Sequence, residues 1–307
     1  MNQKIMNQQI SNQQLRNQCI VITGAARGIG AHLARQLALA GARVALVGLE
    51  PVLLKQLASE LGEQHLWVEC DVCSIPAMQQ AVAQILEKFG RIDVVVANAG
   101  IASSGTVATT PTAALLKTVE VNLNGVINTV SQTLPAMTQS QGYYLLVSSA
   151  AALKSTPGSS AYSASKSGVD HFANAFRLEV AHKGIEVGVV YPAWVDTDLV
   201  KDQQNLDSFN EMLKQLPWPF SVITSVDDCS QAFVEAIGLR KRKQYIPKAL
   251  ASIGPIRQVF MSPLWEHLLQ KRTRTAILKA EAEIQARGLS FGSSSVGSQL
   301  LKQTDQH

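Results

Sequence analysis

A tyrosine and a lysine four residues apart, Tyr162 and Lys166, could together carry out acid–base chemistry. In a helix this spacing places both side chains on one face. A free tyrosine has a pKa near ~10 and is a weak base at neutral pH, but a neighbouring ammonium favours the phenolate and lowers that pKa. The pair by itself is common in proteins, so an exposed tyrosine beside a solvated lysine is the alternative interpretation.

Three glycines follow the first β-branched run of the chain, in the sequence TGAARGIG. Gly24 would permit a tight turn, Gly28 would let the backbone approach a pyrophosphate, and Gly30 would let a helix pack closely on a strand. The helix that follows offers free N–H groups and the positive end of its dipole to phosphates. The spacing is G-x-x-x-G-x-G rather than G-x-G-x-x-G. Its place between a strand and a helix still predicts dinucleotide binding rather than an ordinary turn.

The end of the second predicted strand bears on the choice between NAD and NADP. A ribose 2′-hydroxyl favours a carboxylate there, whereas a 2′-phosphate favours a basic group. Gly48 leaves the expected acidic position without a carboxylate, and Arg27 in the glycine loop could reach a 2′-phosphate. Glu50 argues for NAD if it folds back to the ribose, although it equally suits the first turn of the next helix. The sequence favours NADP, with NAD as the alternative.

Short apolar runs alternate with longer helical stretches from residue 19 onward. Such alternation predicts βαβ units and a parallel sheet buried on both faces, and right-handed crossovers make this a doubly wound, Rossmann-type α/β sandwich. No Pro/Gly-rich linker divides residues 19–247, so we expect one domain there. We predict strands at residues 19–23, 43–47, 65–70, 92–97, 143–148, 185–191 and 244–246, and helices at 29–41, 51–61, 75–89, 112–137, 161–183 and 226–237.

Two segments flank this domain. Residues 1–18 contain ten Asn or Gln and no apolar period, which predicts disorder. Residues 248–307 form an extension that we expect to be partly helical with a frayed end. Residues 240–287 carry eleven Lys or Arg against three Asp or Glu, a pattern typical of a solvated helical surface. The extension could instead complete a substrate pocket, or rest on a membrane surface through residues 257–274.

Several motifs occur together in a recognisable order. After TGAARGIG come Ala97-Asn98-Ala99-Gly100, then Asn122, then Ser148-Ser149, and finally Tyr162 with Lys166. This series, with its spacings, resembles the short-chain dehydrogenases/reductases, in the branch with Tyr-x-x-x-Lys, and here with a C-terminal extension. The resemblance covers about residues 19–247.

The resemblance implies four catalytic residues. Tyr162 would be the general acid/base that exchanges a proton with the substrate oxygen. Lys166 would lower the pKa of that tyrosine and hold the nicotinamide ribose hydroxyls. Ser149 would hydrogen-bond the substrate oxygen, and Asn122 would organise a water that relays protons through Lys166.

The resemblance also implies the remaining cofactor contacts. The Asn98–Gly100 turn would pass close to the adenosine ribose, and Asp71 with Val72 would contact the adenine. After Pro192, Val195 and Thr197 would hold the carboxamide, although Ala193 replaces the usual glycine. The expected cofactor-binding set is Gly24, Arg27, Gly28, Ile29, Gly30, Asp71, Val72, Asn98, Ala99, Gly100, Tyr162, Lys166, Pro192, Val195 and Thr197.

Apolar residues follow the sixth predicted strand, where the family carries its substrate lid. We expect Trp194, Leu199, Leu216 and Trp218 to line a site for an apolar, lipid-, steroid- or terpenoid-like substrate; ordinary packing of a helical insert is the alternative. Because enoyl-reducing members of the family usually have a longer Tyr–Lys spacing, the resemblance also implies hydride transfer at a carbonyl or alcohol carbon rather than at a C=C bond. We therefore predict an NAD(P)-dependent alcohol dehydrogenase or ketone reductase. The alternative is a cofactor-binding sensor or scaffold without turnover.

Composition excludes several classes of protein. The chain has 307 residues, 46% hydrophobic and 16% charged, which is typical of a globular protein rather than a disordered one. No apolar run reaches the ~18 residues that span a bilayer, and the polar start does not resemble a signal peptide. Four cysteines suggest a reducing compartment, so we expect a cytoplasmic protein. We expect no metal, no nucleic acid, and a homodimer through residues 112–137 and 161–183, or a homotetramer.

Overall fold

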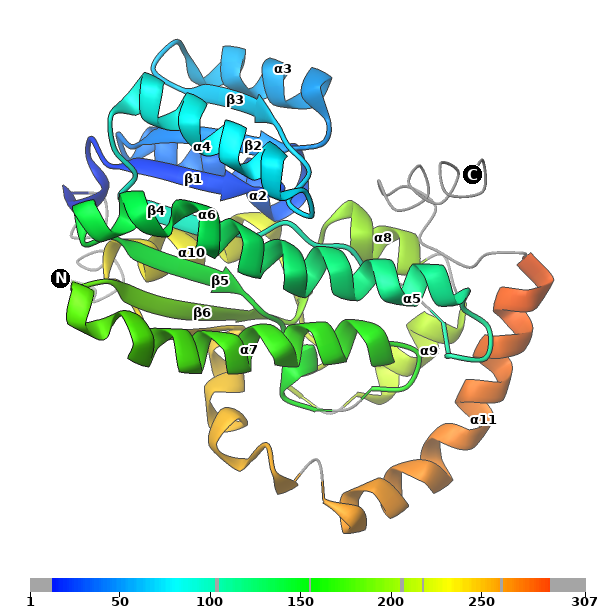
Figure 1. The fold of residues 1–307 in the computed structure, drawn as a ribbon. Helices are drawn as coiled ribbons and strands as arrows, with labels where there is room; N and C mark the ends of the chain where they lie inside the picture. Colours follow the sequence, from blue (N-terminus) through cyan, green and yellow to red (C-terminus); the bar gives the residue numbers. More distant parts are fainter. Residues whose placement is uncertain are drawn as a thin grey trace, which may run out of the picture.

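A seven-stranded parallel sheet lies between two layers of helices in the computed structural model, which describes residues 13–102, 105–154, 156–204, 207–216, 218–259 and 262–287 (Figure 1). The strand order is β3-β2-β1-β4-β5-β6-β9, so the chain winds outward from β1 in both directions. This confirms the predicted doubly wound α/β fold. The strands are β1 (Cys19–Thr23), β2 (Arg43–Gly48), β3 (Leu66–Glu69), β4 (Val94–Ala97), β5 (Tyr143–Val147), β6 (Glu186–Pro192) and β9 (Lys243–Ile246).

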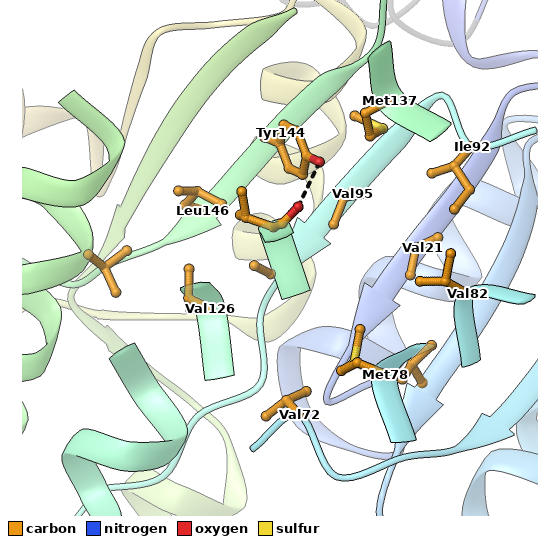
Figure 2. Close-up of a cluster of buried hydrophobic side chains, with 14 of the residues drawn as sticks. Val21, Val72, Met78, Val82, Ile92, Val95, Val126, Met137, Tyr144 and Leu146 are labelled. Carbon is orange, nitrogen blue, oxygen red and sulfur yellow. Dashed lines mark hydrogen bonds between the residues drawn. The ribbon is translucent and has the colours of Figure 1, made fainter. Parts of the chain in front are cut away.

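Side chains alternate between the two faces of the sheet, as the period of two in a strand requires. One face packs on α4 (Ile75–Phe89), α6 (Gly125–Ser140) and α7 (Ser160–Val180). The other packs on α2 (Gly28–Leu39), α3 (Pro51–Leu61) and α10 (Val226–Gly238). Figure 2 shows the first of these clusters, where strand residues such as Val21, Val95 and Leu146 face helix residues such as Met78 and Val126.

The helix ends follow from local chemistry. Ser74 precedes α4 and its Oγ accepts a hydrogen bond from the N–H of Ala77, while Gly90 ends the helix with φ of +75°. Ser225 caps α10 in the same manner. Because these signals are local, the predicted bounds of α4 agree with the structure.

The predicted helix over residues 112–137 is interrupted. It consists of α5 (Thr112–Val119), a π-helical turn (Glu120–Asn124) and α6. The wider turn is closed by a hydrogen bond from the N–H of Gly125 to the carbonyl of Glu120. Such single π turns are frequent at functional sites, and this one contains Asn122.

The N-terminal segment enters the fold earlier than the sequence indicated. Leu15 is fully buried, and the N–H of Asn17 donates to the carbonyl of Gly41 at 2.8 Å. The N–H of Arg43 donates to the carbonyl of Gln18 at 2.8 Å. Residues 13–18 are therefore ordered, and the expectation of disorder is wrong for them; residues 1–12 lie outside the described residues.

Two segments frame the carboxyl ends of the strands. The first joins β6 to α10 and contains β7 (Trp194–Val195), α8 (Asp198–Gln204), α9 (Asp207–Gln215) and β8 (Ile223–Thr224). The second is the extension, with two 3₁₀ turns (Lys248–Ser252 and Gly254–Ile256) and α11 (Pro263–Arg287), whose later half lies beside α9 (Figure 1). The predicted frayed end, residues 288–307, lies outside the described residues. None of the described helices is both long and apolar enough to cross a bilayer.

The start of the extension is fixed to the domain. Leu250 is fully buried and packs with Ala150 and Phe220. Arg257 forms an ion pair with Asp170 of α7, with 2.5 Å between Nη1 and Oδ2. Asp170 is buried and also accepts a hydrogen bond from the hydroxyl of Tyr191. Because these two partners stabilise the carboxylate, they hold the pKa of Asp170 below its usual range despite its burial.

Candidate active site

A cavity of about 260 Å³ opens at the carboxyl ends of the central strands. In open α/β sheets, ligands bind at this edge, where the strand order reverses. All fifteen predicted cofactor-binding residues line it, namely Gly24, Arg27, Gly28, Ile29, Gly30, Asp71, Val72, Asn98, Ala99, Gly100, Tyr162, Lys166, Pro192, Val195 and Thr197. The glycine loop and the tyrosine–lysine pair therefore belong to one site.

The three loop glycines differ in what requires them. Gly24 has φ of +64°, and a Cβ there would lie 2.8 Å from the Cα of Ala99. Gly30 has no room for a side chain, because a Cβ would lie 2.3 Å from the carbonyl oxygen of Gly24. Gly28 has φ of +54°, yet a Cβ there would approach only the Thr197 side chain, at 3.7 Å. Gly24 and Gly30 are thus required for packing, whereas Gly28 presents bare backbone to the cavity.

The start of α2 supplies hydrogen-bond donors to the same cavity. Its N-cap residue, Arg27, makes no side-chain hydrogen bond to the first turn. The first N–H groups of a helix have no partner within the helix, and they carry the positive end of its dipole. Bare backbone at Gly28 next to these donors fits the pyrophosphate of a dinucleotide.

The turn after β4 holds the glycine loop in place. The amide of Asn98 donates to the carbonyl of Thr23 at 2.9 Å and to that of Gly24 at 3.2 Å. The hydroxyl of Thr23 accepts from the N–H groups of Asn98 and Ala99. The family pattern predicts that this turn passes close to a ribose. These hydrogen bonds give it a structural role as well, because they fix the position of the glycine loop.

Arg27 and Glu50 meet at the end of β2. The Nη2 of Arg27 lies 2.7 Å from the Oε1 of Glu50, and the side chains are 42% and 19% exposed. In the sequence, these residues are competing signals for NADP and NAD. The structure joins them in one ion pair, so each restrains the other.

Tyr162 and Lys166 lie on the first turns of α7 and face the cavity. The Nζ of Lys166 donates to the carbonyl of Val147 at 3.0 Å and lies 5.8 Å from the ring centroid of Tyr162. Burial lowers the pKa of Lys166 to about 8. Burial also raises the pKa of Tyr162, and a hydrogen bond with Ser149 opposes that rise.

Burial sets the direction of the pKa shift of Tyr162 in this structure, and the lowering of that pKa by Lys166 stays a prediction. Removing water from the phenol disfavours its charged form, and the ammonium of Lys166 is directed to a backbone carbonyl instead.

Ser149 and Asn122 are buried next to the cavity and are not among the residues that line it. The Oγ of Ser149 accepts from the N–H of Ala151 at 3.1 Å and contacts the carbonyl of Pro192 at 3.3 Å. Asn122 is fully buried, and its amide exchanges two hydrogen bonds with the backbone of Ile101. Its Nδ2 also donates to the Oγ of Ser165, which donates to the carbonyl of Tyr162. The side chain of Asn122 therefore positions the site, and its water-organising role stays a prediction.

The predicted substrate-lining residues are more dispersed. The ring of Trp194 packs edge-on against Phe209, with 5.0 Å between centroids. Leu216 packs on the cluster around Phe220, and Trp218 is 72% exposed. None of these three lines the described cavity, and the side chain of Leu199 lies outside the described part of the chain. Their contact with substrate stays a prediction.

Three further residues in or near the site were not predicted from the sequence. Val200 and Ile101 line the cavity, yet isolated apolar residues cannot be told from core residues without the fold. Lys154 lies with its Nζ 4.3 Å from the ring centroid of Phe220, and burial lowers its pKa to about 8. The residues next to Lys154 in the sequence do not indicate that it is buried beside Phe220.

Cys70 and Cys73, which lie three residues apart, do not form a reactive pair. Burial raises the pKa of Cys70 to about 11 and that of Cys73 to about 12, so both thiols stay protonated. Among the described residues, no group of three or more His, Cys, Asp or Glu side chains could hold a metal ion.

Comparison with known proteins identifies the family. Residues 18–207 match the family model described as short chain dehydrogenase. The chain belongs to the short-chain dehydrogenase family. It is 35% identical over 214 residues to 3-oxoacyl-[acyl-carrier-protein] reductase of Bos taurus, covering 69% of this chain and 88% of that protein. It is 30% identical over 270 residues to dehydrogenase/reductase SDR family member 7B of Bos taurus, covering 83% of this chain and 81% of that one.

Solved structures agree with this assignment. The crystal structure of 3-ketoacyl-(acyl-carrier-protein) reductase from Brucella melitensis complexed with NADH has a TM-score of 0.65 and 25% identity, covering 73% of this chain and 91% of that one. As a short-chain dehydrogenase, the chain is an NAD(P)-dependent oxidoreductase. Its glycine loop, its α2 N-terminus and its tyrosine–lysine pair fit the nicotinamide dinucleotide that this family uses.

Proposed function

We propose that this short-chain dehydrogenase transfers hydride between a nicotinamide cofactor and the carbonyl or alcohol carbon of an apolar substrate. The observation that carries the proposal is a single cavity lined at one end by the glycine loop and at the other by Tyr162 and Lys166. The bound cofactor supplies or accepts the hydride, and the protein orients the reactants and moves the proton.

Three side chains would carry out the proton transfer and the positioning of the reactants. Tyr162 gives its proton to the substrate oxygen as negative charge develops there, and Ser149, which shares a hydrogen bond with Tyr162, stabilises that oxygen. Lys166, charged below about pH 8, would hold the ribose hydroxyls next to the nicotinamide.

The apolar residues around the lid support an apolar substrate. Phe209 and Phe220 are buried and contact Trp194, which follows the cavity-lining residues Pro192 and Ala193. A second substrate class is a 3-oxoacyl thioester, which the similarity to 3-oxoacyl-[acyl-carrier-protein] reductase and the cation of Lys154 favour, since thioester carriers bear phosphate. A long-chain methyl ketone, a steroid ketone and acetoacetyl-coenzyme A, assayed side by side, separate these classes.

The mechanism is tested by Tyr162→Phe with Tyr245→Phe as the matched control. Tyr245 is half-buried and stacks on Tyr191 outside the site, so its variant reports general effects of losing a hydroxyl. We expect Tyr162→Phe to lower kcat by about 10²–10⁴-fold while nucleotide binding is retained. Turnover by Tyr162→Phe equal to that of the control would refute this role.

For the cofactor we propose NADP, with NAD as the alternative. Support comes from the absence of a carboxylate at Gly48 and from Arg27, which lies at the cavity edge. Arg27→Ala should weaken NADPH binding more than NADH binding, whereas Glu50→Gln should strengthen NADPH binding by releasing Arg27. Titration by nicotinamide fluorescence measures both. Equal losses for the two nucleotides in Arg27→Ala would remove Arg27 from the phosphate site.

We also propose a homodimer through α5, α6 and α7. Leu116, Ile127 and Leu178 on these helices are 65%, 39% and 79% exposed, which is costly for large apolar side chains in a monomer. Light scattering of the purified protein tests the dimer, and a monomeric mass at assay concentrations would contradict it.

A further inference from the structure

Glu283 of α11 holds the beginning of α9. Its two carboxylate oxygens accept hydrogen bonds from the N–H groups of Asp207 and Ser208, each at 3.0 Å. These are the first two residues of α9, and their N–H groups have no partner within the helix. A carboxylate at this end also meets the positive end of the helix dipole. Glu283 therefore caps α9 from a helix 75 residues further along the chain.

The other side of α11 is fixed to the loop between β4 and α5. The hydroxyl of Thr106 donates to the Oε1 of Glu281 at 2.6 Å. Ile284 is 6% exposed, and its Cδ1 would lie 3.6 Å from a Cβ at Gly105. The N–H of Gly105 donates to the carbonyl of Gly158, shortly before α7 and Tyr162. Through Gly105 and Thr106, α11 is thus linked indirectly to the segment that precedes Tyr162.

From α9 the contacts continue to the cavity. Phe209 packs edge-on against Trp194, and the indole N–H of Trp194 donates to the carbonyl of Phe220 at 2.9 Å. Trp194 directly follows Pro192 and Ala193, which line the cavity. A displacement of α9 would therefore move Trp194 and the wall next to it.

We propose that Glu283 is a positioning residue for substrate binding: by capping α9, it fixes Phe209 and Trp194, which support the cavity wall at Pro192 and Ala193, relative to Tyr162. This rests on the proposed function. Without the cap, α9 would be ordered in only a fraction of molecules, and substrate binding would carry the cost of ordering it. The glycine loop and the start of α2, which we expect to hold the pyrophosphate, belong to other elements and would be unaffected.

The experiment uses the full chain with three substitutions on α11. Glu283→Ala removes both acceptors, Glu283→Gln keeps one oxygen as an acceptor, and Gln285→Ala changes an exposed side chain on the same turn. KM and kcat are measured with a long-chain methyl ketone and NADPH, and nucleotide affinity is measured by fluorescence. We expect Glu283→Ala to raise the KM for the ketone about fivefold, the size of a lost helix cap, with kcat and nucleotide affinity within twofold of wild type. Glu283→Gln should lie between wild type and Glu283→Ala.

Hydrogen exchange of residues 207–216 provides a second readout that needs no substrate. Glu283→Ala should exchange faster there than Gln285→Ala, while α2 and β1 exchange at unchanged rates. The inference is overturned if α9 exchange is unchanged in Glu283→Ala, or if its KM rises no more than that of Gln285→Ala. Wild-type protein that reduces none of the ketones would contradict the proposed function alone, because the exchange experiment still decides whether Glu283 orders α9.

Discussion

The two ends of the cavity are built by different means. At the nucleotide end, the backbone of the loop is closely packed: Gly30 leaves no space beside Gly24, and the side-chain amide of Asn98 donates to the carbonyls of Thr23 and Gly24. At the substrate end, α9 is held by side chains from the extension, through the cap by Glu283 and an ion pair of Lys279 with Glu211. Both side chains of that ion pair are about half exposed.

This difference separates cofactor binding, which is the same in every reaction cycle, from substrate binding, which can vary. The same nicotinamide dinucleotide serves whatever substrate is bound, so a rigid loop between buried strands suits that end of the cavity. Substrates differ, and a wall fixed by a few surface side chains can change without disturbing the core. A substitution at the nucleotide end should therefore affect folding and binding together, whereas one at the substrate end should affect substrate binding alone.

The largest expected effect is that of Gly30→Ala. A Cβ 2.3 Å from the carbonyl oxygen of Gly24 forces the loop to move, so the free energy of unfolding should fall by about 1–3 kcal/mol. Nucleotide affinity should fall at least about tenfold, because the donors at the start of α2 are displaced. The control is Gly90→Ala, which has φ of +75° and no atom within 4 Å of the new Cβ. Gly90→Ala should lose stability but keep nucleotide affinity, and an equal loss of affinity in both would contradict the packing argument.

Lys166→Met should abolish turnover and, at the same time, stabilise the folded protein. Burial lowers the pKa of Lys166 from 10.5 to about 8, so between these values the unfolded chain binds a proton that the folded chain does not. Wild-type stability therefore falls as pH falls through this window, and below it the full penalty is present. We expect Lys166→Met to lose turnover and to become more stable relative to wild type as pH falls from 10.5 to about 8. Chemical denaturation across that range measures this, and a constant difference would show that Lys166 keeps its ordinary pKa.

The smallest effect is expected for Lys279→Ala. Its ion pair with Glu211 is exposed and screened by water and salt, and such pairs add little to stability. The melting temperature and the KM for the ketone should stay close to those of wild type. A KM that rises as far as in Glu283→Ala would show that charge pairing, rather than capping, fixes α9.

The sequence predicted local features well because their causes are local. Ser74 and Gly90 delimit α4, and β-branched runs form the buried strands of a parallel sheet. Leu15 was missed because a single apolar residue among Asn and Gln shows no period, although it is fully buried. The π turn at Asn122 was also missed, since helical composition continues through it.

By itself, the sequence determined the fold, the glycine loop and the tyrosine–lysine pair, because alternation of short runs and fixed spacings are properties of the chain. Only the tertiary structure decided that Arg27 pairs with Glu50, that burial raises the pKa of Tyr162, and that Glu283 caps α9. Each of these depends on which distant groups meet and on how much water is removed from them. Burial and long-range pairing are set by the assembled fold.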